Sequence, residues 1–292
     1  MGWVKITAKS LLCGAVACGL AFGIVLALAY WSGEARAVDS AALQGFLGLD
    51  RAGSRPLINS LIDIGNPAPV ALIGISLALL ALARGRPRVA LFVLVLIAIT
   101  SVSSQTLKAL LAHPRPREVP AGIGDAAFPS GHATAIMSLA IALVVAMPAR
   151  LRPPAAALGL GLVVAVSYSL VSLGGHFPSD VLGGYLLATG TALVLLAGLR
   201  AAEVRYPERE GRRKAVLVAH HWADRVAAVG LAAGLSIGML VAGGLVILAA
   251  FRGPQIVDYA QANTTFFVVA GVLALSALLL LAALTSVLSR RA

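Results

Sequence analysis

Long apolar stretches that lack a polar face run through most of this chain. A helix at a protein–water boundary carries a polar stripe, so a soluble helical array is excluded. Only 12% of the residues are charged, against about 25% in soluble domains. Eight stretches approach the roughly 20 residues that a bilayer-crossing helix needs, at about 11–30, 68–83, 89–111, 131–148, 155–174, 180–199, 226–251 and 266–288. The sequence therefore predicts an all-α, polytopic helical membrane protein.

The predicted spans divide into a core and an appended pair. Residues 1–199 hold six spans, residues 200–225 form a charged linker, and residues 226–292 form a two-span helical hairpin. His220 and His221 lie in the linker and are interpreted as surface residues, since a metal site needs more ligands than this segment offers. Glycines in the hairpin indicate close helix packing. The pair can serve as a homodimer contact, a surface for another partner, or one wall of the entry to a site.

Lys and Arg residues set the predicted orientation. With the amino terminus inside, 16 of the 23 fall in cytoplasmic segments, and the outer seven are Arg36, Arg51, Arg55, Lys108, Arg115, Arg117 and Arg252. Both termini are then cytoplasmic. A composition rich in Ala, Leu and Arg points to a bacterial inner membrane. Because the charge of +11 is explained by orientation, no nucleic-acid partner is predicted.

The amino-terminal segment has a second interpretation. Residues 1–37 carry Lys5 and Lys9, an apolar core and an Ala35-Arg36-Ala37 site, as a cleaved secretory signal does. Cys13 and Cys18 lie in the same apolar run, so no disulfide framework is expected; a lipoprotein-type signal at Cys18 is the competing explanation. Residues 45–49 and 56–62 of the first outer loop are predicted to lie along the membrane interface as short amphipathic helices.

Two clusters on the predicted outer side suit an anion. Lys108 to Pro116 reads KALLAHPRP, and the flanking prolines stiffen the backbone around Arg115. Arg presents a planar fork to phosphate oxygens, and Lys adds a point charge. In Pro129 to His132, Ser130 is a natural N-cap and Gly131 admits a ligand to a helix start that favours anions. The alternatives are a snorkelling lysine, loop charges and an ordinary capped helix.

The third cluster, Ser169 to Asp180, reads SLVSLGGHFPSD and supplies a nucleophile. Asp180 opens an apolar run, where an unpaired carboxylate would be costly. An aspartate that accepts from one ring nitrogen of His176 leaves the other unprotonated, which prepares a nucleophilic imidazole. His132 adds a second titratable group close to the membrane, where such groups are usually functional. A purely structural His–Asp contact is the alternative.

Together these motifs resemble the signature of the type 2 phosphatidic acid phosphatase superfamily, which also includes vanadium haloperoxidases. The resemblance covers residues 108–180 and implies that His176 attacks phosphorus, Asp180 orients it and His132 protonates the leaving oxygen. Lys108, Arg115, Ser130 and the Gly131 amide would hold the phosphate oxygens. No cofactor or metal is expected, since the sequence offers no carboxylate cluster for Mg²⁺.

One position departs from the family pattern. The family has Ser-Arg ahead of the second histidine, and here the pair is Ser169-Leu170. A phosphate-binding cation is therefore absent from its usual place. Arg117 is one substitute, and Arg36, Arg51 or Arg55 from the first outer loop are others.

Three functions compete. The favoured one is a lipid phosphatase of the outer face, acting on a polyprenyl diphosphate, phosphatidylglycerophosphate, phosphatidic acid or lipid A. The second is a phosphotransferase that passes the phosphoryl group to a lipid or sugar. The third is a non-catalytic phospholipid binder or transporter, which would not need a His–Asp pair.

Overall fold

A computed structural model describes residues 7–50, 53–114, 123–206, 222–236, 238–239 and 253–289. Within these ranges the chain is helical with no β-strand, which confirms the predicted all-α class. The helices are α1 (Ala8–Trp31), α2 (Gly33–Leu47), α3 (Arg55–Asp63), α4 (Pro67–Ala83), α5 (Pro87–Leu110), α6 (Gly131–Ala146), α7 (Arg152–Ser172), α8 (Pro178–Arg205), α10 (Gly253–Ala262) and α11 (Thr264–Ser289). Residues 222–236 are also helical.

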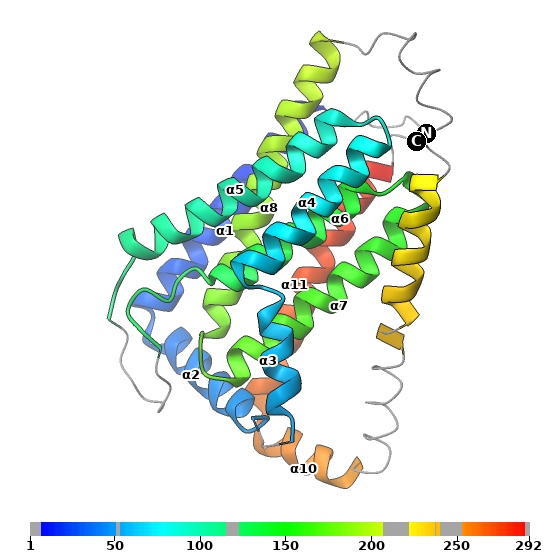
Figure 1. The fold of residues 1–292 in the computed structure, drawn as a ribbon. Helices are drawn as coiled ribbons and strands as arrows, with labels where there is room; N and C mark the ends of the chain where they lie inside the picture. Colours follow the sequence, from blue (N-terminus) through cyan, green and yellow to red (C-terminus); the bar gives the residue numbers. More distant parts are fainter. Residues whose placement is uncertain are drawn as a thin grey trace, which may run out of the picture.

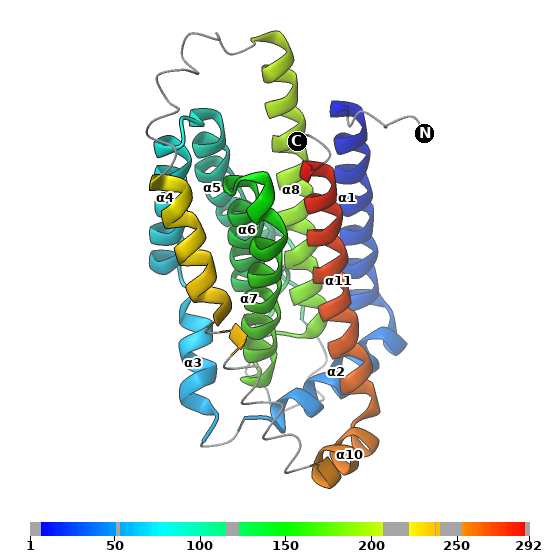
Figure 2. The same ribbon diagram turned by 90° about the vertical axis from the view of Figure 1, so that its right-hand side faces the viewer.

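The centre of the bundle is α6, which packs against α4, α5, α7 and α8 (Figures 1 and 2). Most of its residues are buried. Close approach depends on glycines of its neighbours: a Cβ at Gly184 of α8 would stand 2.9 Å from the Ser130 carbonyl oxygen and the Thr134 amide nitrogen. The first turn of α6 is therefore fixed tightly against the first turns of α8.

Six of the ten helices with printed bounds correspond to the predicted six-span core. By length and composition, five helices among the described residues can cross a membrane, or six if the bent pair α3–α4 counts as one span. The expectation of eight spans exceeds this number because α4 has 17 residues and α6 has 16. Half of the seventh predicted span, 226–251, lies outside the described residues.

The helical path bends between α3 and α4, where the two helix axes differ by 53°. The Asn66-Pro67 pair explains the break: Asn66 is extended, with φ −67° and ψ 153°, and Pro67 takes the first helical position of α4. The predicted interfacial segments 45–49 and 56–62 overlap α2 and α3. In both views α2 and α10 lie obliquely across one end of the bundle.

The opposite end carries the basic turns. The first turn of α1, the α4–α5 turn, the end of α8 and the last turn of α11 all lie at this end of the bundle (Figure 2). Arg84 is buried and donates from Nε to Asp224 Oδ1 at 2.8 Å, while Arg86 donates to the carbonyl of Val145. These contacts join the α4–α5 turn to the end of α6 and to the helical residues 222–236.

The C-terminal helix α11 packs on the core rather than apart from it. The Tyr168 hydroxyl on α7 donates to the Ala270 carbonyl at 2.6 Å, and Arg152 Nη1 donates to the Leu288 carbonyl at 2.6 Å. The rings of Phe46 and Phe266 meet edge to face, 4.7 Å apart. Helix α11 therefore covers α2 and α7 within the same chain.

Candidate active site

The turn between α7 and α8 presents His176. Gly174 makes this turn possible because its φ of 68° lies in the left-handed region that side chains disfavour. Phe177 is then the N-cap of α8 and Pro178 takes the first helical position. Asp180, at the third position, accepts the Phe177 amide on Oδ2 at 3.0 Å. The carboxylate thus closes the turn that carries His176.

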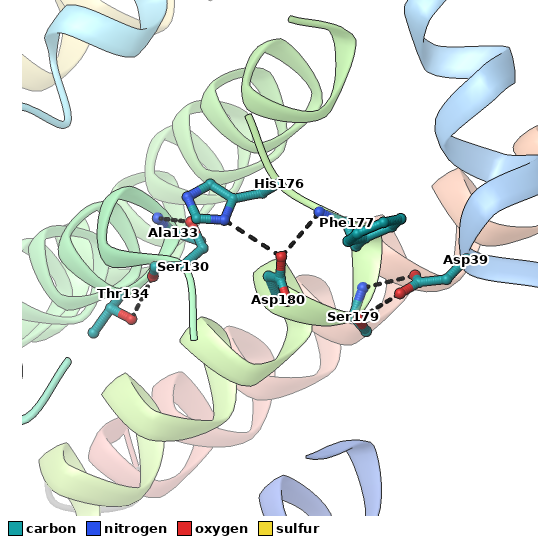
Figure 3. A network of polar contacts seen from close by, with 8 residues as sticks. All are labelled: Asp39, Ser130, Ala133, Thr134, His176, Phe177, Ser179 and Asp180. Carbon is teal, nitrogen blue, oxygen red and sulfur yellow. Dashed lines mark hydrogen bonds and ion pairs between the residues drawn. The ribbon is translucent and has the colours of Figure 1, made fainter. Parts of the chain in front are cut away.

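His176 and Asp180 form the His–Asp contact that the sequence predicts (Figure 3). His176 Nδ1 lies 3.4 Å from Asp180 Oδ2, longer than a strong hydrogen bond. Among the described residues, no contact of this ring nitrogen meets hydrogen-bond geometry. The Asp180 side chain is fully buried and the His176 side chain is 10% exposed. Because Nδ1 faces the carboxylate, Nε2 is the nitrogen available to a substrate.

Ser130 fixes the start of α6 beside this pair. Its amide donates to the Asp180 carbonyl at 2.9 Å, and its Oγ accepts the Ala133 amide at 3.3 Å, which is the predicted N-cap bond. Thr134 Oγ1 donates back to the Ser130 carbonyl at 2.7 Å. Figure 3 shows Ser130 and Ala133 next to the His176 ring. The second and third sequence clusters therefore meet at one place.

His132 lies in the first turn of α6 and contacts the α3–α4 break. Its Nε2 is 3.0 Å from Asn66 Oδ1. The groups that act on it electrostatically include His176, Lys108 and Asp63. The two predicted histidines are thus electrostatic neighbours, contributed by different helix starts.

A cavity of about 440 Å³ extends from His132 along the bundle between α4, α5 and α6. At one end it is polar, with Ser104, Gln105, Lys108 and Gly131 beside His132. Its remaining walls are mostly apolar: Pro67, Val70, Ala71, Ile75, Leu94, Ile97, Ala98 and Ala135. Of these residues, Leu94 and Ile75 are exposed. The cavity therefore joins a polar end to an apolar flank of the helices.

The comparisons with known proteins concern the family and the fold. The family model of the PAP2 superfamily matches residues 89–202, the segment that carries all three clusters. This segment is similar to proteins of the PAP2 superfamily. The fold is similar to that of the first transmembrane PAP2-type phosphatidylglycerolphosphate phosphatase from Bacillus subtilis, with a TM-score of 0.54 and 21% sequence identity. That match covers 66% of this chain and 98% of the other. No curated protein matches the sequence at a significant level.

Of the cations that are expected to bind the phosphate, the structure describes only Lys108. Lys108 lies in the last turn of α5 and lines the cavity. Arg115 and Arg117 lie outside the described residues, as does Arg51. Their roles remain predictions.

The described arginines of the first outer segment are engaged elsewhere. Arg55 binds Asp50 through two nitrogens, and these bonds lower the pKa of the Asp50 carboxyl below its ordinary value. Arg36 donates to the Tyr30 carbonyl. Leu170, which replaces the family arginine, is buried in the apolar core. No described arginine therefore takes the place of the missing PAP2 cation.

Four residues of the PAP2 site region were missed by sequence reasoning. Asn66 contacts His132, Asp39 of α2 binds both the amide and the hydroxyl of Ser179, and Ser104 and Gln105 line the cavity. For the α5 pair a signal was available: both precede Lys108 by about one helical turn, so they share a face with it. The sequence contains no such signal for Asn66 or Asp39, because these residues reach the site only through tertiary packing.

Proposed function

We propose that this protein is a membrane lipid phosphatase that hydrolyses a lipid phosphomonoester or diphosphate through a phosphohistidine on His176. The observation that carries the proposal is the buried His176–Asp180 pair at the start of α8, hydrogen-bonded through the backbone to the start of α6. The PAP2 family match and the phosphatase fold of the structural neighbour support a phosphatase.

In the first step, His176 Nε2 attacks phosphorus while the bond from phosphorus to the leaving oxygen breaks. Asp180 holds the proton on Nδ1, so the Nε2 lone pair is free for attack. His132 donates a proton to the leaving oxygen, so the lipid departs as a neutral alcohol or a lipid monophosphate. Lys108 and the amides at the start of α6 stabilise the equatorial oxygens.

In the second step, the oxygen of a water molecule attacks phosphorus and forms the new phosphorus–oxygen bond. His132, now unprotonated, accepts the proton of that water. The bond to His176 Nε2 breaks, the electron pair returns to the ring, and inorganic phosphate leaves. Both histidines are then in their starting states, and each proton is accounted for.

We infer the substrate class from the cavity, whose lining includes His132 and Lys108 but not His176. The polar end beside His132 and Lys108 suits a phosphate, and the apolar walls of α4 and α5 suit a hydrocarbon chain that remains at the bilayer level. We place this cavity on the outer side of a bacterial inner membrane, since the basic turns lie at the opposite end of the bundle.

A phosphotransferase on the same site would differ only in the second step, where a lipid or sugar hydroxyl replaces water. Labelled diphosphate lipid separates the two: quantitative release of free phosphate supports hydrolysis, and label in a second lipid supports transfer. A non-catalytic binder or transporter would release no phosphate.

The test is turnover by purified wild-type protein on a panel of lipid phosphates, compared with His176→Ala. The proposal expects release by wild type and a loss of at least 10⁴-fold in the variant, on the scale of nucleophile removal. His220→Ala, in the predicted linker, is the matched histidine control and should retain activity. Phosphate release by His176→Ala at the wild-type rate would contradict the proposal.

A further inference from the structure

The Ser104 hydroxyl on α5 is buried and has no partner within the described structure. Only 1% of the residue is exposed. Thr100, one turn earlier on the same helix, satisfies its hydroxyl on the Leu96 carbonyl at 2.7 Å, whereas Ser104 Oγ makes no such bond. A buried hydroxyl left unpaired costs free energy. Because Ser104 lines the cavity, a ligand there can supply the missing acceptor.

Two further donors approach the same point as this hydroxyl. A Cβ atom built on Gly131 would stand 3.4 Å from Ser104 Oγ, 3.7 Å from Gln105 Nε2 and 3.7 Å from Lys108 Nζ. Gly131 has no side chain, so this space is left to a ligand. The point adjoins the first amides of α6, where a helix start favours an anion.

We propose that Ser104 and Gln105 donate hydrogen bonds to the substrate phosphate beside Lys108. They partly replace the cation missing at Leu170. This inference rests on the proposed function and adds two residues to the hydrogen-bond donors that bind the phosphate. A hydroxyl, a carboxamide and an ammonium group can each donate to a different oxygen of one phosphate. A single point charge would not fix the orientation of those oxygens.

A structural role and a ligand-binding role for Ser104 predict opposite effects of Ser104→Ala on the Tm. If its hydroxyl serves the ligand, Ser104→Ala removes an unsatisfied group, so the Tm of the empty protein stays equal or rises. The kcat/KM falls by about 10- to 100-fold, the range for a hydrogen bond to a charged group. Gln105→Leu, which keeps the size of the side chain, should behave similarly. Ser103→Ala, on the neighbouring residue outside the cavity lining, is the control.

Vanadate supplies a readout that does not need turnover. We expect it to raise the Tm of the wild type and of Ser103→Ala, and to raise the Tm of Ser104→Ala and Gln105→Leu much less. A full vanadate shift in both variants, with kcat/KM within twofold of wild type, would overturn the inference. If the wild type binds vanadate but releases no phosphate from any substrate, the proposed function fails while the donor set stands.

Asn66 carries a second, independent inference. It is the N-cap of α4, yet its side chain makes no capping bond. Instead Nδ2 donates to Asp63 Oδ1 at 3.0 Å, and Oδ1 faces His132 Nε2 at 3.0 Å. A Cβ at the preceding Gly65 would stand 2.8 Å from His132 Cδ2. One edge of the His132 ring is thus held by the α3–α4 break.

We infer that Asn66 is a positioning residue for His132. Its carboxamide oxygen accepts the Nε2 proton, so Nδ1 is the nitrogen that gives a proton to the leaving oxygen and takes one from water. Among the described residues, the charged and titratable groups that act on His132 are Asp63 from α3, Lys108 from α5 and His176 from the turn before α8. Asp63 polarises Asn66 and favours the protonated ring.

The dependence of activity on pH tests how Asn66 affects the protonation of His132. The acid step needs protonated His132, so activity falls as pH rises and the ring deprotonates. Asn66→Leu removes the acceptor from the protonated ring and should move this alkaline limb to lower pH. Asn66→Asp adds a carboxylate and should move it to higher pH. A merely structural residue would give no such pair of opposite shifts.

The leaving group gives a second readout. Asn66→Leu should slow hydrolysis of an alkyl phosphate about 10- to 100-fold, the contribution of one acid–base group. It should change kcat/KM for 4-nitrophenyl phosphate by less than about threefold, because kcat/KM reports the first step and that leaving oxygen needs little protonation. Equal losses on both substrates, or an alkaline limb that moves in neither variant, would contradict the role of Asn66.

Discussion

At the scale of single residues, the site depends on the buried carboxylate of Asp180, which makes two contacts. Asp180 faces His176 Nδ1 and also accepts the Phe177 amide on the same oxygen. The orientation of the imidazole and the closure of its turn are therefore set by one side chain. Removing its charge affects chemistry more than folding, because an amide can still close the turn.

Asp180→Asn should lower kcat by about 10³- to 10⁴-fold, as loss of an orienting aspartate does elsewhere. The Asn side chain keeps an oxygen for the Phe177 amide, so the Tm should fall by only a few degrees. Steady-state kinetics and thermal melts on the same preparation check both statements. A variant with near-normal kcat would show that the pair is structural.

Metal removal is a second prediction at this scale. The proposed steps use only side chains, so activity should persist after dialysis against EDTA, measured as phosphate release with and without added Mg²⁺. Strong inhibition that Mg²⁺ reverses would instead point to metal-assisted transfer.

The sequence predicted the pairing of His176 with Asp180 because both lie within one turn of a helix start, where spacing determines contact. It could not predict that Asn66 meets His132, or that Asp39 meets Ser179, since these pairs are 66 and 140 residues apart. The unpaired Ser104 hydroxyl also required coordinates, because a serine in a helix usually bonds the preceding turn.

At the scale of elements, the first turn of α8 is held from outside by α2. Asp39 is buried and accepts both the amide and the hydroxyl of Ser179, as Figure 3 shows. Ser179 lies next to Asp180, so this contact anchors the turn that presents His176. An aspartate at a helix start also complements the helix dipole.

Asp39→Ala should therefore destabilise the protein by about 1–2 kcal/mol, the cost of losing a helix cap, and should lower kcat by loosening the turn. Ser179→Ala removes part of the same contact. The double variant should be less impaired than the sum of the single effects, which melts and kinetics on all three variants will measure. Additive effects would show that Asp39 acts elsewhere.

At the scale of the whole molecule, the polar clusters and the basic turns lie at opposite ends of the bundle. The number and order of the core helices were predicted from hydrophobic length. Helix α4 matches the predicted span 68–83 to within one residue. Helix α6 ends two residues before the predicted span 131–148 does, because apolar residues beside a span end look the same in sequence as the span itself. The packing of α11 on α2 and α7 could not be read from its composition, which is uniformly apolar.

The orientation can be measured by cysteine labelling in a background without Cys13 and Cys18. Gln261→Cys, exposed on α10 at the site end, should react with a membrane-impermeant maleimide in intact cells. Val204→Cys, exposed near the end of α8, should react only after permeabilisation. The reverse pattern would place the site on the cytoplasmic side.

The central claim is that phosphorus becomes bonded to His176. The most direct measurement is rapid quenching of the enzyme in base with a ³²P-labelled lipid phosphate, followed by peptide mapping. The account predicts an acid-labile, base-stable label on the peptide that contains His176, absent in His176→Ala and lost on longer incubation in water. Rapid phosphate release with no label on His176, or a label on another residue, would contradict it.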